Sequence, residues 1–282
     1  MYNKSIIITK KNLFNSSCKL GIILPYKKKF YIAIFLFFLI ATQSFSKPNK
    51  QTAMIFAPAS LKDSLSEVIE LYQKERPLHI KQVYLGTAQL AQQIKNGAEP
   101  DIFISANIQW MEHLEERGLV LEKYRYILLR NSLVAVTNYE HFNSKEKKYF
   151  NNVKKTFLET KTRISLAMVD AVPAGIYAKE FFKNIKIWHA VKFNIANSPN
   201  VRAAMSYVSR GDLEYGVVYR SDAMADERIK IIYDLDKSYY TKIEYPMTIL
   251  NKKEKTINFY NFLKNKKTKK IFTKWGFIVS YD

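Results

Sequence analysis

Cysteine is nearly absent from this sequence. The 282 residues contain one cysteine, Cys18, which precedes an apolar segment near the N-terminus. Removal of that segment would leave a chain without any thiol, which excludes disulfides, cysteine-ligated metals and thiol nucleophiles. A lipoprotein anchor is excluded as well, because it needs a cysteine directly after the apolar segment, where Lys47 stands.

Glycine and proline are also scarce, with eight of each, whereas 14% of the residues are aromatic. This composition is typical of a globular chain and excludes a disordered one. We find no internal repeat and no low-complexity linker. The length allows a substantial core and predicts roughly two domains.

Acidic residues are outnumbered, since 25 Asp and Glu face 45 Lys and Arg, for a formal net charge of +20. Lys, Asn, Ile, Phe and Tyr are abundant together, which an AT-rich genome produces without selection for binding polyanions. We favour that explanation and expect no nucleic-acid partner. A polyanion binder that uses the lysine cluster between Lys264 and Lys274 stays open as an alternative, and its binding would fall steeply with salt.

The first 46 residues have the pattern of a secretory signal. Three lysines, Lys27–Lys29, precede the apolar run Phe30–Ala41, and the small residues Ser44 and Ser46 follow. The run is about a dozen residues long, whereas a membrane span needs about 20. Cleavage after Ser46 would remove seven lysines and no acidic residue, leaving a net charge of +13. We therefore expect residues 1–46 to be removed and the rest to be a soluble, exported protein.

Next comes an apolar strand that leads into a helix. Ala53–Ala57 is short and apolar, and from Leu61 to Tyr72 apolar residues recur at helical spacing. Ser60 stands at the joint, where a serine can cap the helix through its hydroxyl group. The free N–H groups of a first turn, together with the positive end of the helix dipole, can also hold an anion.

The same pattern of strand, turn and helix recurs along the chain. The expected strands and helices are 79–85 and 89–96 with Thr87 at the N-cap, 101–106 and 109–117, 131–136, 152–158, 164–169 and 173–182, 200–210, 215–219, 243–250 and 254–264. Alternation of this kind predicts an α/β fold with mainly parallel sheets flanked by helices. The order fits two lobes, with residues 132–245 forming lobe 2 inside a lobe 1 made of 47–131 and 246–282.

Catalytic and metal-binding motifs are missing. No nucleophile elbow, zinc-binding histidine pair, phosphate loop or dinucleotide fingerprint occurs, and the four histidines are scattered singly. Asp101, Asp170 and Asp222 lie beside predicted strands, where capping and turn roles are the simpler interpretation. We expect no enzyme, no cation site and no cofactor, although an enzyme that depends on Asp170 or Asp222 is a further alternative.

Uncharged donors at helix starts are what does recur. Ser60, Thr87, the turn at Val172–Gly175 and the turn at Asn200–Val201 all follow predicted strands. Such turns gather at the carboxyl edge of an open α/β sheet, where ligands bind. Hydroxyl and N–H donors favour a small, fully deprotonated anion, because a protonated oxyanion also needs an acceptor.

Several short motifs also match a known family in order and spacing. They are Ala57-Pro-Ala-Ser-Leu, Leu90-Ala-Gln-Gln-Ile-Lys-Asn-Gly-Ala, Asp101-Ile-Phe-Ile-Ser-Ala, Trp110-Met, Asn131-Ser-Leu-Val, Val172-Pro-Ala-Gly-Ile-Tyr-Ala-Lys-Glu, Asn200-Val-Arg and Gly216-Val-Val-Tyr-Arg-Ser-Asp-Ala. Through them the chain resembles the periplasmic molybdate-binding proteins of molybdate ABC importers, from about Thr52 to Phe277.

This resemblance implies a type II periplasmic binding-protein fold with a ligand cleft between two lobes. It implies that molybdate, and tungstate with it, is bound as the oxyanion and passed by a monomer to an inner-membrane ABC permease. The implied ligand residues are the hydroxyl groups of Ser60, Thr87 and Tyr219 and the main-chain N–H groups of Ala174 and Val201. A receptor for another small anion, such as sulfate or phosphate, is the alternative on the same fold.

Two positions depart from the family pattern. Thr87 stands where the family often has Ser, which keeps the hydroxyl group and adds a methyl group. Pro58 replaces a small residue and removes one N–H group, although not one of the implied donors.

Overall fold

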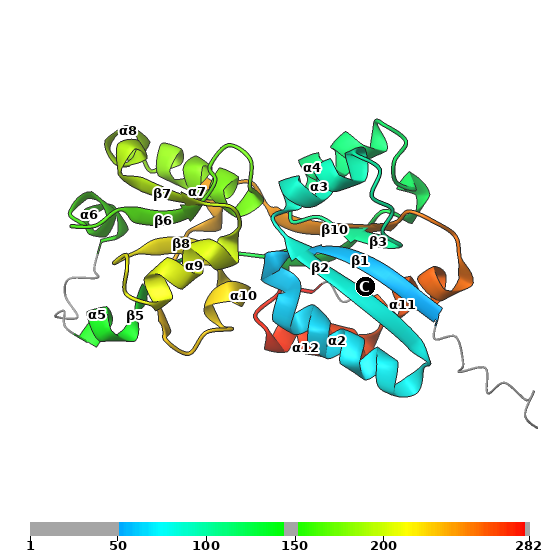
Figure 1. The fold of residues 1–282 in the computed structure, drawn as a ribbon. Helices are drawn as coiled ribbons and strands as arrows, with labels where there is room; N and C mark the ends of the chain where they lie inside the picture. Colours follow the sequence, from blue (N-terminus) through cyan, green and yellow to red (C-terminus); the bar gives the residue numbers. More distant parts are fainter. Residues whose placement is uncertain (1–50, 144–151, 280–282) are drawn as a thin grey trace, which may run out of the picture. The chain divides into compact units, whose positions relative to one another are not determined.

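The computed structural model describes residues 51–143 and 152–279, which belong to one compact unit (Figure 1). The predicted signal sequence, residues 1–46, lies outside the described residues. Within the described ranges, no helix combines the length and apolar character needed to cross a membrane.

The strands form two five-stranded sheets. Sheet A contains β1 (Gln51–Pro58), β2 (Leu78–Leu85), β3 (Ile102–Ile104), β4 (Tyr126–Asn131) and β10 (Ile243–Ile249). Sheet B contains β5 (Leu133–Asn138), β6 (Ile164–Ala167), β7 (Ile195–Ser198), β8 (Gly216–Tyr219) and β9 (Ile229–Asp234).

Helices cover both faces of sheet A, whose strand order is β2-β1-β3-β10-β4. On one face lie α3 (Thr87–Lys95) and α4 (Ile108–Glu115), and on the other lie α2 (Lys62–Glu75), α11 (Glu254–Leu263) and α12 (Lys266–Lys274) (Figure 1). Neighbouring residues of β1 divide between the two layers, because side chains alternate along a strand. Ile55 joins the core beneath α2, and Phe56 joins the smaller core beneath α3 and α4.

Sheet B has the order β7-β6-β8-β5-β9. The principal helices that pack on it are α7 (Pro173–Asn184) and α9 (Val201–Ser209) (Figure 1). Short helices complete this half: α5 (Tyr139–Asn143), α6 (Val153–Leu158), α8 (Trp188–Val191) and α10 (Arg220–Ala223).

Each sheet is parallel except for one reversed strand. β10 runs antiparallel to β3 and β4, and β5 runs antiparallel to β8 and β9. The chain passes from sheet A to sheet B at Ser132, between β4 and β5, and returns between β9 and β10. The predicted α/β class with mainly parallel sheets is confirmed. The lobe boundaries at 131/132 and 245/246 stay a prediction, and β10 begins at Ile243.

Several helices and strands differ from the predictions made from the sequence. The strand predicted at 131–136 overlaps β5, but its start is misplaced, because Asn131 ends the separate strand β4 and the apolar run gives no turn signal at Ser132. β7 and β9 were not predicted. The lysine cluster that begins at Lys264 was not predicted to be helical, yet it forms α12, which buries Thr268 and Phe272.

Candidate functional site

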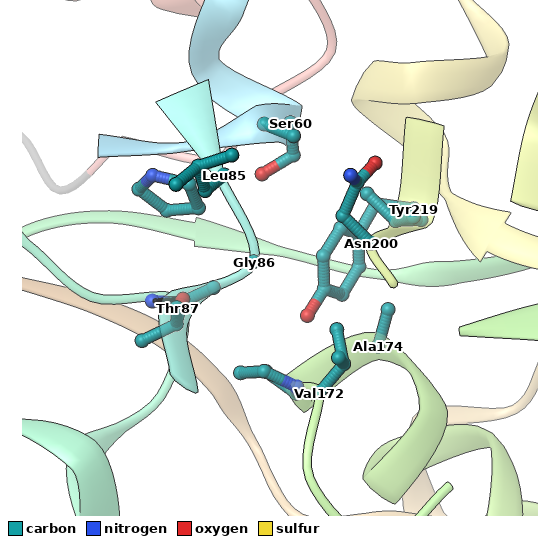
Figure 2. Close-up of a pocket in the computed structure, with 13 residues that line it drawn as sticks. Ser60, Leu85, Gly86, Thr87, Val172, Ala174, Asn200 and Tyr219 are labelled. Atoms are coloured by element: carbon teal, nitrogen blue, oxygen red, sulfur yellow. Dashed lines mark hydrogen bonds between the residues drawn. The ribbon is translucent and has the colours of Figure 1, made fainter. Parts of the chain in front are cut away.

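A pocket lies where the ends of strands from both sheets meet the helices that follow them (Figure 2). The pocket and its opening contain about 220 Å³ free of protein atoms, a volume that includes open solvent. Its lining residues are Pro58, Ala59, Ser60, Leu85, Gly86, Thr87, Ala106, Val172, Pro173, Ala174, Asn200, Val201 and Tyr219.

All five residues predicted to bind a ligand line this pocket: Ser60, Thr87, Ala174, Val201 and Tyr219. The first two follow strands of sheet A, and the other three follow or end strands of sheet B. The fold therefore brings together residues up to 159 positions apart in the chain. Their role as ligands stays a prediction.

Three helix starts point backbone donors toward this space. Thr87 is the first residue of α3, Val201 is the first of α9, and Ala174 is the second of α7. N–H groups of a first helical turn have no acceptor within their own helix and lie at the positive end of its dipole. The Asn200 side chain accepts only the later N–H of Ala203, at 2.9 Å. The N–H groups of Thr87, Ala174 and Val201 are thus placed to bind an anion.

Glycines allow two close backbone approaches beside the pocket. A Cβ atom at Gly175 would lie 2.2 Å from the carbonyl oxygen of Ala167, so only glycine lets α7 start this close to β6. A Cβ atom at Gly86 would lie 2.7 Å from the carbonyl oxygen of Pro199. Gly86 follows a strand of sheet A and Pro199 a strand of sheet B, so this glycine allows the two sides to approach closely.

Ser60 does not cap a helix, so that part of the prediction is wrong. It lies within the 3₁₀ turn Ala59–Leu61 that precedes α2, and its side chain makes no capping hydrogen bond. Its hydroxyl oxygen lies 2.9 Å from the hydroxyl oxygen of Tyr245, and only 2% of the residue is exposed. The hydroxyl group of Ser60 is therefore held by a side chain 185 residues away and lines the pocket.

Thr87 also differs from its predicted N-cap role, because Gly86 is the N-cap of α3. The backbone N–H of Ala106 donates to the Thr87 hydroxyl oxygen at 3.1 Å. That bond occupies a lone pair of the oxygen and leaves the hydroxyl proton available for an acceptor in the pocket.

Tyr219 brings a hydroxyl group that lacks a partner. The residue is 1% exposed, and its hydroxyl oxygen has no hydrogen-bond partner among the described residues. Figure 2 shows this hydroxyl group directed into the space between Thr87 and Val172. Burial raises the pKa of the Tyr219 hydroxyl well above its ordinary value, so the group stays neutral and can donate. A ligand or an ordered water in the pocket that accepts from this hydroxyl group would satisfy it.

No charged side chain is found among the described residues that line the pocket. Two cations stand next to lining residues in the sequence, and both are already paired. Arg220, next to Tyr219, forms an ion pair with Asp234. The other cation is Arg202, next to Val201. Its Nη2 atom lies 2.6 Å from Asp63 Oδ2 and its Nε atom 2.5 Å from Asp222 Oδ1. Burial opposes the charge of Arg202, but Asp222 and Asp63 outweigh it and raise the pKa. Burial raises the pKa of Asp222 to about 6, although Arg202 counters it.

Two polar contacts cross from the sheet A side to the sheet B side next to the pocket. One is the ion pair between Asp63, in the first turn of α2, and Arg202 of α9. The other is the hydrogen bond from the indole Nε1 of Trp110, in α4, to the carbonyl oxygen of Ala171 at 3.1 Å. Arg202 is next to Val201, and Ala171 lies three positions before Ala174. The two sides are therefore in contact close to the pocket.

The carboxylates considered for catalysis lie elsewhere. Asp170 forms an ion pair with Lys179 and its side chain is 77% exposed. Asp101 accepts hydrogen bonds from the N–H of Met54 and from Asn251, as a structural residue does. Within residues 51–143 and 152–279, no three His, Cys, Asp or Glu side chains gather in a way that could hold a metal ion.

Sequence reasoning missed three residues around the site: Tyr245, Trp110 and Arg202. Trp110 and Arg202 lie inside motifs that carry the family resemblance, but the resemblance implied no role for either residue. Tyr245 lies in β10 and had no signal, because its contact with Ser60 depends on the register of a strand far along the chain.

Comparison with known proteins places this arrangement in a family. The family model of bacterial extracellular solute-binding proteins matches residues 53–278. The chain belongs to this family. Its two-lobed fold, with the pocket between the lobes, is the fold of these solute-binding proteins.

One relative and two solved structures are similar to this chain. The molybdate-binding protein ModA of Escherichia coli is 30% identical over 86% of this chain and 95% of its own length. The periplasmic molybdate-binding protein of Azotobacter vinelandii has a TM-score of 0.71 at 18% identity, over 81% of this chain and all of that one. The sulfate-binding protein SubI of Mycobacterium tuberculosis has a TM-score of 0.67 at 13% identity, over 80% and 86% of the two chains. At these identities the two structures establish the fold alone.

Proposed function

We propose that this solute-binding protein captures molybdate outside the cytoplasm and delivers it to an ABC permease in the inner membrane. The observation that carries the proposal is a pocket of uncharged donors that includes the buried hydroxyl group of Tyr219, for which the described part of the chain offers no hydrogen-bond partner. The name of the Escherichia coli relative supports molybdate as the guest. Tungstate, an oxyanion of nearly the same size and charge, should bind with it.

The proposed ligand set is the hydroxyl groups of Ser60, Thr87 and Tyr219 with the N–H groups of Ala174 and Val201. Hydroxyl and N–H donors hold a dianion without a counter-charge when helix dipoles point at it. A protonated oxyanion also needs an acceptor for its proton, and no carboxylate, the strongest acceptor, lines the pocket among the described residues. The donor set therefore favours molybdate, tungstate or sulfate over monohydrogen phosphate.

Binding would draw the two lobes together. The proposed ligands come from residues 47–131 on one side and 132–245 on the other, so the oxyanion contacts both lobes only when they are close. A ligand shifts an equilibrium toward the state that it contacts more fully. The contacts from Trp110 and Asp63 would help to hold that closed state.

The remaining parts of the proposal follow from the sequence. Residues 1–46 would act as a signal peptide that is removed on export to the periplasm. The mature chain would work as a monomer, without a cofactor, a cation or a catalytic step, and molybdenum would be present only as the oxyanion. Nucleic acid is not among the proposed partners.

A receptor for sulfate or another small anion is the second candidate, because the sulfate-binding protein SubI has the same fold. Donor chemistry alone does not separate sulfate from molybdate, since both are tetrahedral dianions. The relative's name favours molybdate.

Calorimetric titration of the mature chain with molybdate, tungstate, sulfate and phosphate tests the proposal. We expect saturable binding of molybdate and tungstate with one site per chain. Saturable binding of sulfate with none of molybdate would overturn the choice of guest. A steep loss of affinity with salt would instead favour the polyanion alternative.

A further inference from the structure

A chain of buried hydrogen bonds leads from the crossing between the sheets to the pocket. It runs from Asn131, the last residue of β4, through Tyr245 of β10 to Ser60. All three residues are buried, with exposures of 4%, 0% and 2%. Solvent therefore offers these groups no competing partners, and the direction of each bond is set by its neighbours.

The direction starts at Asn131. The backbone N–H of Ser132 donates to Asn131 Oδ1 at 2.9 Å, which identifies that atom as the oxygen. The amide nitrogen Nδ2 then lies 2.9 Å from Ser221 Oγ and 3.4 Å from the Tyr245 hydroxyl oxygen. An amide NH₂ group has no lone pair to offer, so it donates to both.

The hydrogen bond from Asn131 fixes the direction in which Tyr245 donates. Its oxygen accepts a hydrogen bond from Asn131 Nδ2, and its own hydroxyl group cannot donate back to an NH₂ group, which has no lone pair to accept with. Tyr219 lies close by, but among the described residues the other group in hydrogen-bond geometry with Tyr245 is Ser60 Oγ, at 2.9 Å, so Tyr245 donates to Ser60. Burial raises the pKa of the Tyr245 hydroxyl above its ordinary value, so the proton stays on the oxygen.

The last member is Ser60, whose single proton is left over once its oxygen accepts from Tyr245. Ser60 lines the pocket, so that proton is free to point toward a ligand (Figure 2). Without Tyr245 the hydroxyl group could rotate and present a lone pair, which repels an oxyanion.

We propose that Tyr245 is a positioning residue that makes Ser60 an obligate hydrogen-bond donor, with Asn131 setting the direction of the relay. The proposal rests on the proposed function, in which Ser60 binds an oxyanion. It also assigns the relay a part in selectivity, because a Ser60 that can only donate disfavours oxyanions that carry a proton.

The test is a double-mutant cycle with Tyr245→Phe and Ser60→Ala, measured by molybdate titration up to millimolar concentration. Tyr245→Phe alone should weaken binding about five- to tenfold, the usual size of one buried hydrogen bond. In the Ser60→Ala background the same change should alter affinity by less than about twofold, because no hydroxyl remains to be oriented. A merely structural role for Tyr245 would weaken binding equally in both backgrounds.

Tyr260→Phe is the matched control. The Tyr260 hydroxyl is also buried and donates to the carbonyl oxygen of Tyr124 at 2.8 Å, but it does not line the pocket. Its loss should lower the unfolding temperature without changing molybdate affinity. Competition with phosphate at neutral pH gives a second readout, in which Tyr245→Phe should reduce the ratio of molybdate to phosphate affinity.

Unchanged molybdate affinity in Tyr245→Phe, equal losses in both backgrounds, or an unchanged molybdate-to-phosphate ratio would each overturn the relay while leaving the proposed function standing. If the wild-type chain binds sulfate and not molybdate, the proposed function fails. The cycle is then measured with sulfate, for which the relay predicts the same pattern.

Discussion

The two sides of the pocket supply the same kind of donor by different means. The sheet A side contributes side-chain hydroxyl groups, from Ser60 and Thr87, each held by a hydrogen bond to another part of the fold. The sheet B side contributes the N–H groups of Ala174 and Val201 at helix starts, and one hydroxyl group, from Tyr219. A side-chain donor is lost when its own residue changes. A backbone donor depends instead on the neighbours that fix the backbone.

The largest loss of affinity should come from displacing the backbone donors of the sheet B side by a substitution at Gly175. In Gly175→Ala the new Cβ atom would meet the carbonyl oxygens of Ala167 and Met168 at 2.2 and 2.5 Å. The start of α7 must then move, which displaces the N–H of Ala174. We expect molybdate affinity to fall about 100-fold and the free energy of unfolding to drop by about 1–3 kcal/mol.

Ala174→Gly is the control for this prediction, because it keeps the N–H group and removes only the side chain. Its affinity should stay within about threefold of the wild type, since Gly weakens a helix by only about 1 kcal/mol. Calorimetric titration and urea unfolding measure both effects. Wild-type affinity in Gly175→Ala would show that the backbone donor of Ala174 is not used.

Tyr219→Phe separates binding from stability on the same side of the pocket. The hydroxyl group has no partner among the described residues, so its removal should leave the ligand-free protein as stable or slightly more stable. Affinity for molybdate should fall about 10- to 100-fold, because a hydrogen bond to a charged group is lost.

Tyr215→Phe should do the reverse. The Tyr215 hydroxyl lies 3.0 Å from His141 Nε2 and does not line the pocket, so its loss should lower stability and leave affinity unchanged. Urea unfolding without ligand, followed by titration, distinguishes the two variants. A Tyr219→Phe protein that binds as tightly as the wild type would remove this residue from the site.

The same contrast explains how far the sequence alone could lead. Alternating strands and helices predicted the α/β fold, and the family motifs predicted five residues that do line one pocket. The hydrogen-bond partners could not be predicted, because Ser60 meets Tyr245 only through the pairing of β10 with β3 and β4. The prediction of a helix cap at Ser60 considered only hydrogen-bond partners that are near it in the sequence.

Strand boundaries failed for a related reason. Tyr126–Val136 carries apolar residues on both sides of Ser132, so no local signal marks the point where the chain leaves sheet A for sheet B. The separation of β4 from β5 is decided by their partners, β10 on one side and β8 and β9 on the other.

A smaller effect should follow from changing the hydroxyl side at Thr87. Thr87→Val keeps the shape and removes the hydroxyl group, so affinity should fall about tenfold and the N–H of Ala106 should lose its acceptor. Thr87→Ser keeps the hydroxyl group and should bind within about twofold of the wild type. Titration of the pair measures the effect on affinity of removing the hydroxyl group, together with its bond to Ala106. Equal affinity in both variants would mean that Thr87 only supports the Ala106 backbone.

The smallest effect on affinity should be that of pH. It tests whether both sides of the pocket bind the anion through neutral donors. Burial raises the pKa of Tyr219, and no charged residue lines the pocket among the described residues, so molybdate affinity should be flat between about pH 7 and 9. Below the Asp222 pKa of about 6, protonation removes one of the two carboxylates that neutralise Arg202, beside Val201. Affinity should then rise, by less than about threefold, as the positive charge of Arg202 is uncovered.

Asp222→Asn separates the two parts of this profile, because it removes the titrating group and should make the affinity flat through the acidic range as well. Titrations at constant ionic strength measure both proteins. A decline in wild-type affinity between about pH 7 and 9 would require a cationic group with a lowered pKa in contact with the anion. That result would contradict a pocket built from neutral donors on both sides.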